Sequence, residues 1–356
     1  MSYDLFAALK ASNDAEIEAV QNGRLNELLI NNVYTRLKLL SGDIFSKDKI
    51  KAAHKKIVHE RKLYDPLIAS ELERMGVLYI KKPQIDINSF PRFSCYIQFT
   101  FKLAKPYLSK DDDAFYTCEN PIKKDKVFKV PMVAASTWKG NMRWTARQNL
   151  GLNSAQSDSP VIIRLFGNEK GKDSRLKRGR LNFFPTFFDR IGLEVINPHD
   201  RKTKAGTLPI YIETVPTGAA GIFSLLYVPF DLMGRPEDHV RRGVVKDLEI
   251  IHSGIKGMML TYGFSAKKNS GFGIIKDELM AVSCEMNGIN VQDSQNMRKA
   301  KTKLRSKPVS LINLKTGIEE KEREAVAENC MTFEDLEQKI ELIMSELTKS
   351  ETARRP

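Results

Sequence analysis

A pair of cations at helical spacing follows a small-residue turn in the segment Pro131-Met-Val-Ala-Ala-Ser-Thr-Trp-Lys-Gly-Asn-Met-Arg143. An apolar strand-like run ends here, and Ser136 or Thr137 is a candidate cap for the helix that we expect to follow. Lys139 and Arg143 are four residues apart, so they share one helical face beside an N-terminus that attracts anions. The chemistry that this pattern favours is binding of a phosphate backbone. In isolation, an ordinary capped helix with solvated cations explains the pattern better, so the interpretation depends on the rest of the chain.

The net charge of the chain is strongly positive. Its 57 Lys and Arg exceed its 44 Asp and Glu, which gives a formal net charge of +13 and implies an anionic partner. Two further basic segments have no apolar face, which argues against a helix at a membrane surface and favours loops that lie along nucleic acid. They contain Lys170, Lys172, Arg175, Lys177, Arg178 and Arg180, and then Arg298, Lys299, Lys301, Lys303, Arg305 and Lys307. Solvated loops are the alternative.

A glycine-rich segment, Gly263-Phe-Ser-Ala-Lys-Lys-Asn-Ser-Gly-Phe-Gly273, adds another basic site. Its Lys267 and Lys268, with Gly271 and Gly273, suit close approach to a phosphate backbone. The segment follows an expected helix instead of preceding one, and its lysines lack the Ser or Thr context of a phosphate-binding loop of ATPases. It therefore favours RNA binding without ATP hydrolysis.

Other classes of function lack support in the sequence. The chain has neither a signal-like start nor an apolar run long enough to cross a bilayer, so we expect a cytoplasmic protein with no membrane partner. Its four cysteines are scattered without Cys-x-x-Cys spacing, which favours reduced thiols. His54 and His59 are five residues apart and point to different faces of a helix, so we expect no metal site there.

The elements that must position these residues change in character near residue 90. Before it, apolar residues at three- and four-residue steps predict one helix, and a second is expected from Lys47 to His59. After it, the alternating pattern from Phe93 to Leu103 predicts a half-buried strand. The helical stripe consists of Leu25, Leu28, Leu29, Val33, Leu37 and Leu40. Further strands are expected over 127–133, 179–188, 193–197, 208–215 and 222–228, and a helix from Asp238 to Tyr262.

These elements predict an α+β fold in which helices cover an antiparallel sheet. We expect a mainly helical region over 1–90, the core over 91–290, a basic linker or loop over 291–330 and an amphipathic helix over 331–356. The apolar stripe of the last helix is predicted to dock onto its own protein, and less often such a stripe docks onto a neighbour. It consists of Phe333, Leu336, Ile340, Ile343 and Leu347.

Four segments resemble the RAMP superfamily, whose members are the repeated backbone subunits of multi-subunit CRISPR effector complexes. They are the strand over 93–103, Glu119-Asn-Pro-Ile122, the segment over 131–143 and the segment over 263–273. The second and third also match in order and spacing. The family motif Pro-x-Ser-Ser-Leu-Lys-Gly-x-x-Arg is represented here by Pro131, Ser136, Lys139, Gly140 and Arg143. The resemblance covers roughly residues 90–280.

The resemblance implies a ferredoxin-like, RRM-related core in a class 1, type III-like complex. Such a subunit binds guide CRISPR RNA along its backbone, stacks with copies of itself and with further effector subunits, and positions target RNA for base pairing. The predicted RNA-binding residues are Ser136, Thr137, Lys139, Arg143, Lys177, Arg178, Arg180, Lys267, Lys268, Gly271 and Gly273.

The resemblance also raises the question of cleavage. Type III subunits that cut target RNA generally carry an aspartate where this chain has Glu119, and the longer side chain displaces the carboxylate enough to weaken catalysis. We therefore expect an RNA-binding subunit without strong nuclease activity and without a cofactor. A divalent metal such as Mg²⁺ is expected only if the chain cleaves RNA. Asp111, Asp112 and Asp113 are alternative carboxylates, although three adjacent acids are more typical of a solvated loop.

Two other functions stay open. One is a stand-alone, metal-dependent ribonuclease that processes the guide precursor, with His199 or His54 as general base. Against it, neither histidine has a recognisable acid-base partner in the sequence. The other is a scaffold whose acidic C-terminal helix recruits a separate nuclease, which is compatible with RNA binding.

Overall fold

The computed structural model describes residues 14–25, 28–41, 45–80, 82–111, 116–118, 120–153, 156–168, 176–197, 209–289 and 330–352. A four-stranded antiparallel sheet lies at its centre, in the order β10-β3-β9-β5. These strands are β3 (Cys95–Lys102), β5 (Leu181–Phe183), β9 (Ala220–Tyr227) and β10 (Met280–Met286). The strand predicted over 93–103 and the α+β class are confirmed.

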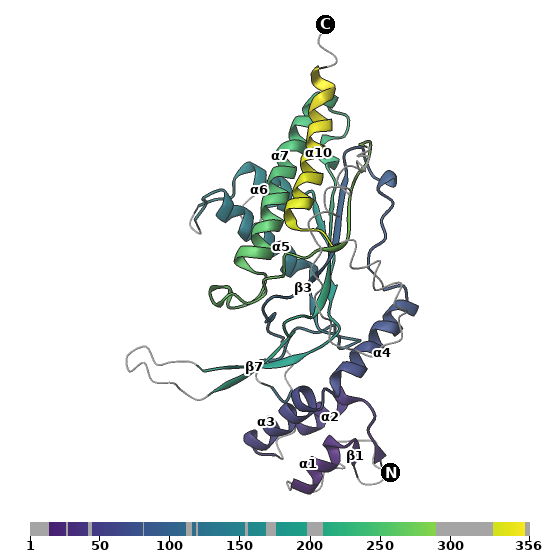
Figure 1. The fold of residues 1–356 in the computed structure, drawn as a ribbon, viewed down its shortest axis with the longest axis vertical. Helices are drawn as coiled ribbons and strands as arrows, with labels where there is room; N and C mark the ends of the chain where they lie inside the picture. Colours follow the sequence, from purple (N-terminus) through teal and green to yellow (C-terminus); the bar gives the residue numbers. More distant parts are fainter. Residues whose placement is uncertain are drawn as a thin grey trace, which may run out of the picture.

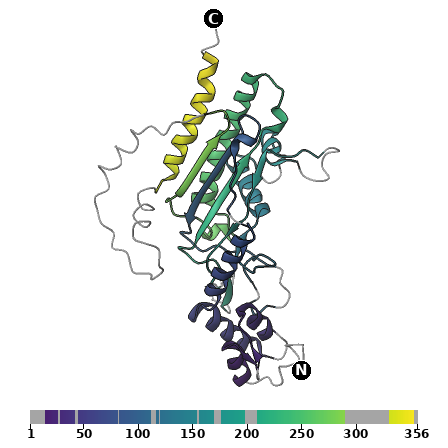
Figure 2. The ribbon, with the colours of Figure 1, turned by 90° about the vertical axis from the view of Figure 1, so that its right-hand side faces the viewer.

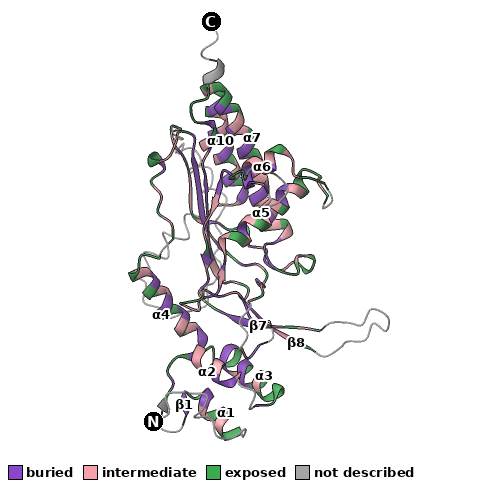
Figure 3. Ribbon diagram, turned by 180° about the vertical axis from the view of Figure 1, so that it is seen from behind, coloured by how far each residue is buried: buried purple, intermediate pink, exposed green. Residues whose placement is uncertain are grey.

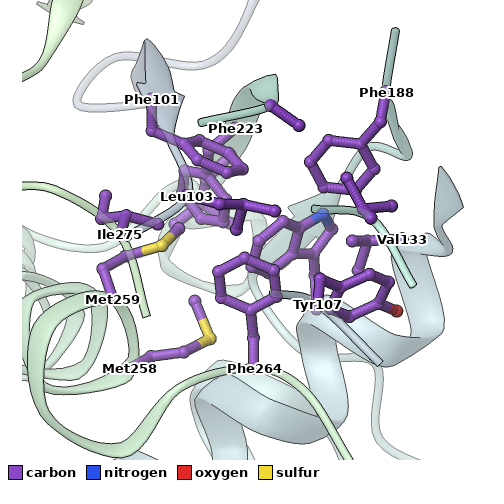
Figure 4. Packing of buried hydrophobic residues seen from close by; sticks show 14 of the residues in the cluster. Phe101, Leu103, Tyr107, Val133, Phe188, Phe223, Met258, Met259, Phe264 and Ile275 are labelled. Carbon is purple, nitrogen blue, oxygen red and sulfur yellow. The ribbon is translucent and has the colours of Figure 1, made fainter. Parts of the chain in front are cut away.

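Helices cover one face of this sheet (Figures 1 and 2). They are α5 (Ala135–Asn149), α6 (Pro160–Phe166), α7 (Glu237–Lys256) and α10 (Phe333–Thr352). Aromatic residues of the sheet and of α5 meet beneath them: Trp138 lies 5.1 Å from Phe223 and 4.4 Å from Phe264, measured between ring centroids. Figure 4 shows this packing, in which Phe101, Leu103 and Met259 also take part. The other sheet face is covered by the segment before β3, where Tyr96 and Gln98 donate hydrogen bonds to the Pro83 carbonyl.

The C-terminal helix α10 docks on its own chain, as its apolar stripe predicts. All five stripe residues are buried, and Phe333 lies 5.8 Å from Phe99 of the central strand. The helix also pairs with α7, because Lys256 Nζ lies 2.7 Å from Glu337 Oε2. Burial of one side of an amphipathic helix supplies most of its stability, so α10 is an integral part of the fold.

The N-terminal part is mainly helical, with one correction. It contains α1 (Asp14–Gln21), α2 (Val33–Leu40), α3 (Lys47–Lys55), the π-helical turn η1 (Lys56–Glu60) and α4 (Tyr64–Val77). The helical stripe predicted from Leu25 is wrong over its first part, where β1 (Arg24–Leu25) and β2 (Leu28–Leu29) pair as a short hairpin. Gly23, at φ +78°, ends the preceding helix and turns the chain. Leu25 lies in this hairpin, and its side chain is buried there as it would be on the inner face of a helix. Apolar spacing alone therefore could not distinguish the hairpin from a helix.

Two predicted strands are shorter than expected. Within 127–133 only β4 (Met132–Val133) is a strand, because Asp125 Oδ1 accepts hydrogen bonds from the Val127 and Phe128 amides and forms a turn. The run over 179–188 is divided at Pro185 into β5 and β6 (Thr186–Phe187). The predicted helix over 238–262 is α7 followed by the π-helical turn η4 (Gly257–Tyr262).

A two-stranded ribbon projects from the body. It consists of β7 (Gly192–Ile196) and β8 (Ile210–Thr214), paired antiparallel from Gly192 opposite Thr214 to Ile196 opposite Ile210. Figures 1 and 3 show the ribbon leaving the molecule between α5 on one side and α3 on the other. The N-terminal helices occupy one end of the molecule, and α7 and α10 the other (Figure 1).

One hydrophobic core connects the N-terminal helices to the sheet, from Ile17 through Ile57 to Phe99. The proposed boundary near residue 90 therefore stays a prediction, as do the other domain limits. Among the described helices, none is long and apolar enough to cross a membrane.

Candidate nucleic-acid interface

No side chain caps the N-terminus of α5. The cap position is Ala134, in an extended conformation with ψ 151°. The prediction that Ser136 or Thr137 is the cap is therefore wrong, because the helix begins one residue before Ser136. The Thr137 and Trp138 amides donate to the Ala134 carbonyl. An uncapped N-terminus keeps its partial positive charge available to an anion.

A hollow of about 450 Å³ lies beside this N-terminus, and we call it the α5 hollow. Its lining includes Ser136 and Thr137, two of the residues predicted to bind RNA, together with two lysines from an earlier segment. One of them, Lys123, binds Asp111 at 2.8 Å, and the Lys124 amide donates to the second oxygen of Asp111 at 3.2 Å. The lining residues are Ser109, Lys110, Asp111, Lys123, Ala134, Ser136 and Thr137.

The glycine-rich segment folds against α5, so two motifs that are far apart in the sequence meet. Asn141 Nδ2 donates to the Phe264 carbonyl at 3.1 Å, and the ring of Phe264 packs on Trp138. Ser265 Oγ accepts from the Leu108 amide at 2.7 Å and donates to the Leu108 carbonyl at 2.9 Å. These bonds hold the loop, α5 and the chain leading to the hollow in one arrangement.

The two predicted glycines of this loop have different explanations. Gly273, at φ +74°, packs on the loop itself, because a Cβ there would lie 2.5 Å from Ser265 Cβ. Gly271, at φ +76°, ends the short 3-10 turn η5 (Lys268–Ser270) and has open space around its missing side chain. The left-handed turn already requires a glycine at position 271, and packing within the loop requires one at position 273. Neither glycine therefore needs a close approach of RNA to explain it.

Two of the predicted lysines are partly desolvated on this side of the molecule. Lys268 Nζ lies 4.3 Å from the ring centroid of Trp144 on α5, and burial lowers the pKa of Lys268. Burial, and then the charge of Arg143, lower the pKa of Lys139. Cations held partly out of water gain more from a bound anion than fully solvated cations do. Lys267 is exposed, with φ +57°.

Arg143 is engaged within the protein. Its guanidinium and that of Arg147 both form ion pairs with Asp158, which lies just before α6. A phosphate would have to compete with this carboxylate for Arg143. The helical spacing placed Arg143 on the correct element, but the acid that binds it is fifteen residues away and gives no local signal.

The prediction that Arg180 contacts RNA is corrected by the structure, because its side chain is only 2% exposed. It binds Asp231 at 2.5 Å and the fully buried Asp247 at 2.6 Å, and Arg164 binds the other oxygen of Asp247. This ion-pair network joins the residue before β5 to α6 and α7 and makes Arg180 unavailable to RNA in this structure. Lys177 and Arg178 are exposed, and Arg178 lies 5.5 Å from the ring of Phe230.

Several predicted residues lie outside the described part of the chain: Glu119, Asp112, Asp113, His199, Lys170, Lys172, Arg175 and the basic segment over 298–307. His54 is described and is buried, with Nδ1 2.5 Å from Thr117 Oγ1. Its burial, and the contacts of its two ring nitrogens with Thr117 and Glu213, argue against His54 as a general base for RNA. Within the described ranges, no cluster of three or more His, Cys, Asp or Glu is placed to hold a metal ion.

Sequence reasoning missed Lys110, Lys123 and Trp144. The two lysines precede and follow an acidic stretch, so their charge did not stand out, and a single tryptophan on a helix is more typical of the core. Trp144 is 39% exposed, however, and the structure places it beneath Lys268.

Comparisons with known proteins match the part of the chain that builds this interface. Residues 100–276 match the RAMP superfamily. The chain is 27% identical over 189 residues to the CRISPR system Cms endoribonuclease Csm3 of Streptococcus thermophilus, covering 49% of this chain and 81% of that protein. It is 29% identical over 126 residues to the protein of the same name from Enterococcus italicus, covering 31% of this chain and 58% of the relative.

A solved structure, the type III-B Cmr-beta complex bound to cognate target RNA, contains a chain that is 16% identical. Its TM-score is 0.40, and the match covers 67% of this chain and 73% of that one. The RAMP match begins inside β3, at residue 100, and spans the α5 hollow, β9 and the glycine-rich loop, whereas α1 to α4 lie before it. Through residues 100–276, the chain belongs to the RAMP superfamily.

Proposed function

We propose that this chain is the guide-RNA-binding backbone subunit of a type III CRISPR effector complex. The observation that carries the proposal is that the RAMP match covers the same residues that build a cationic hollow at an uncapped helix N-terminus. Both curated relatives are named as components of a CRISPR system. Its partners are guide CRISPR RNA, target RNA, further copies of the chain and other effector subunits.

The chemistry of the α5 hollow suits recognition of an RNA backbone. In the hollow, the helix N-terminus and Lys110 bind phosphate oxygens, and Lys139 and Lys268 extend the cationic surface along α5. Charge and hydrogen bonds to phosphate read no base sequence. Sequence recognition is left to base pairing between the guide and its target. Trp144, which supports Lys268, is 39% exposed, so its ring is accessible to a base.

The test is the salt dependence of RNA binding. Replacing Lys139 and Lys268 by Gln should weaken binding of a repeat-containing RNA and flatten the plot of log affinity against log salt by about 0.7 for each lost phosphate contact. The matched control replaces Lys339 and Lys349 by Gln, which makes the same charge change on α10, a helix that does not line the hollow. Equal slopes for the wild type and both variants would remove Lys139 and Lys268 from the RNA site.

Cleavage of target RNA is a second candidate function, because both relatives are named endoribonucleases. Asp111 does not fit as a metal ligand in this conformation, because its two oxygens bind Lys123 and the Lys124 amide. We expect weak or no cleavage from this chain in an assembled complex with Mg²⁺. Strong cleavage that Glu119→Ala abolishes would show that the subunit is a nuclease.

A further inference from the structure

A strongly basic segment lies outside the RAMP match, on α3 and the turn after it. Residues 47–62 contain seven Lys or Arg and two Asp or Glu. Lys47, Lys51 and Lys55 recur at four-residue spacing, so they share one face of α3. We call these three residues the α3 lysine stripe. Like charges at this spacing repel one another in the free protein, and a bound polyanion removes that repulsion.

The stripe is accessible to a ligand. Lys47 is exposed, and Lys55 forms an ion pair of 3.5 Å with Glu60 in which the side chains are 47% and 52% exposed. An exposed ion pair of this length stabilises the protein little. It therefore presents a small barrier to a phosphate that approaches Lys55.

The stripe runs beside the root of the β7–β8 ribbon. Lys51 and His54 line a cavity of about 210 Å³ together with residues of both ribbon strands, and the turn η1 contacts β7. The ribbon side of the cavity is formed by Leu193, Pro209, Ile210 and Tyr211. A strand of RNA that passes the ribbon root on this side meets the lysines of α3.

A buried network fixes α3 in this position. Glu213 of β8 is fully buried, and its carboxylate lies 3.3 Å from His54 Nε2 and 2.5 Å from Lys124 Nζ. Tyr116 donates to the same carboxylate at 2.6 Å, and His54 Nδ1 lies 2.5 Å from Thr117 Oγ1. The helix is therefore attached both to the ribbon and to the chain that leads to the α5 hollow, so the stripe is held at a defined place relative to both.

Helix α3, which carries the stripe, and α5, whose N-terminus borders the hollow, lie on different sides of the ribbon in Figures 1 and 3. We propose that the α3 lysine stripe is a second binding site for an RNA phosphate backbone, across the ribbon from the α5 hollow. This inference rests on the proposed function. The phosphates come from the continuation of the strand bound at α5 or from the strand paired with it.

The experiment compares three full-length variants with the wild type: K47Q/K51Q/K55Q, K139Q/K268Q, and the control K246Q/K339Q/K349Q on α7 and α10. Each is titrated at several salt concentrations with an unstructured single-stranded RNA that carries a repeat sequence, and with the same RNA annealed to its complement. Thermal unfolding of each variant confirms that it is folded. We expect K47Q/K51Q/K55Q to lower the salt slope by about 0.7 for each lysine that contacts a phosphate, while the control leaves it unchanged.

The two RNA probes identify the source of the phosphates. Weaker binding of the single strand assigns the stripe to the continuation of the same strand, and weaker binding of the duplex alone assigns it to the paired strand. If K139Q/K268Q weakens binding but K47Q/K51Q/K55Q matches the control with both probes, the second site does not exist and the proposed function stands. If the wild type binds neither RNA, the proposed function itself is wrong and the inference falls with it.

Discussion

Gly140 is an exposed glycine inside α5, and packing against the described part of the chain does not require a glycine there. No heavy atom there lies within 4 Å of the place where its Cβ would be, and it sits between Lys139 and Asn141 on the helix that borders the hollow. Glycine in a helix interior costs about 0.5–1 kcal/mol relative to alanine. Close approach of an RNA backbone would account for a residue that the isolated fold does not require.

Gly140→Ala should therefore raise the free energy of unfolding by about 0.5–1 kcal/mol while lowering RNA affinity. Gly76→Ala in α4 is the matched control, since a Cβ at Gly76 also meets open space and should stabilise the protein without changing RNA binding. Urea unfolding and RNA titration of both variants make the comparison. Unchanged RNA affinity in Gly140→Ala would mean that RNA does not approach this helix closely.

Glu213 should make the protein sensitive to acid. Burial alone would raise the pKa of Glu213, but Lys124 and His54 outweigh it and lower the pKa to about 2. Because the folded pKa lies below the usual value of 4.5, this carboxylate stabilises the fold above pH 4.5, and the stabilisation is lost as the pH falls towards 2. Glu213→Gln should flatten the stability profile over that window.

The same substitution leaves the buried ammonium of Lys124, 4% exposed, without its carboxylate. Loss of one partner of a buried pair typically costs about 3–5 kcal/mol at neutral pH. Glu341→Gln, at an exposed position of α10, serves as the control and should stay within about 0.5 kcal/mol of the wild type. If Glu213→Gln lowers the free energy of unfolding at neutral pH by no more than Glu341→Gln does, the network contributes little to stability.

Residue-level prediction succeeded where the partner is local and failed where it is distant. The spacing of Lys139 and Arg143 correctly placed both on one helix, whose N-terminus has no side-chain cap. Nothing near Arg180 in the sequence indicates Asp231 or Asp247, so its burial could not be foreseen. Lys110 and Lys123 enter the hollow only because Asp111 folds their segment back on itself.

At the scale of elements, α10 is predicted to behave as part of the core. Ile340→Ala should lower the free energy of unfolding by about 2–5 kcal/mol, because Ile340 is buried against the sheet side of the helix. Leu342→Ala, at a 40% exposed position of the same helix, should cost less than about 1 kcal/mol. Chemical denaturation of the two variants measures the difference, and equal losses would show that α10 is not docked as described.

This placement also bears on the scaffold hypothesis. Because the apolar stripe is buried in its own fold, removal of residues after 330 should destabilise the whole protein and reduce RNA affinity with it. Retained RNA affinity in the truncated chain, with loss of a partner, would instead support a recruiting role for α10.

Helices and strands were predicted correctly where the sequence pattern extends over several repeats. The long alternation over 93–103 and the apolar stripe of α10 each span several repeats, and both are confirmed. Short runs were ambiguous: a capped turn at Asp125 replaced most of one predicted strand, and a hairpin after Gly23 replaced the start of a predicted helix. In both places local turn chemistry outweighed the apolar spacing.

At the scale of the whole molecule, the sequence predicted the fold class but not how its parts come together. No pattern indicates that the N-terminal helices contact the ribbon, because that contact depends on Glu213, His54 and Thr117 from three separate segments. The proposed function belongs to this scale too, because it assigns guide-RNA binding to one face built from α5 and the glycine-rich loop.

The most direct test is to purify the native protein and the K139Q/K268Q variant from cells that contain the CRISPR locus and to sequence the RNA bound to each. The account predicts short RNAs that share a constant repeat-derived end with the wild type, and strong depletion of them in the variant. Wild-type protein that carries no such RNA, or a variant that retains it in full, would contradict the account.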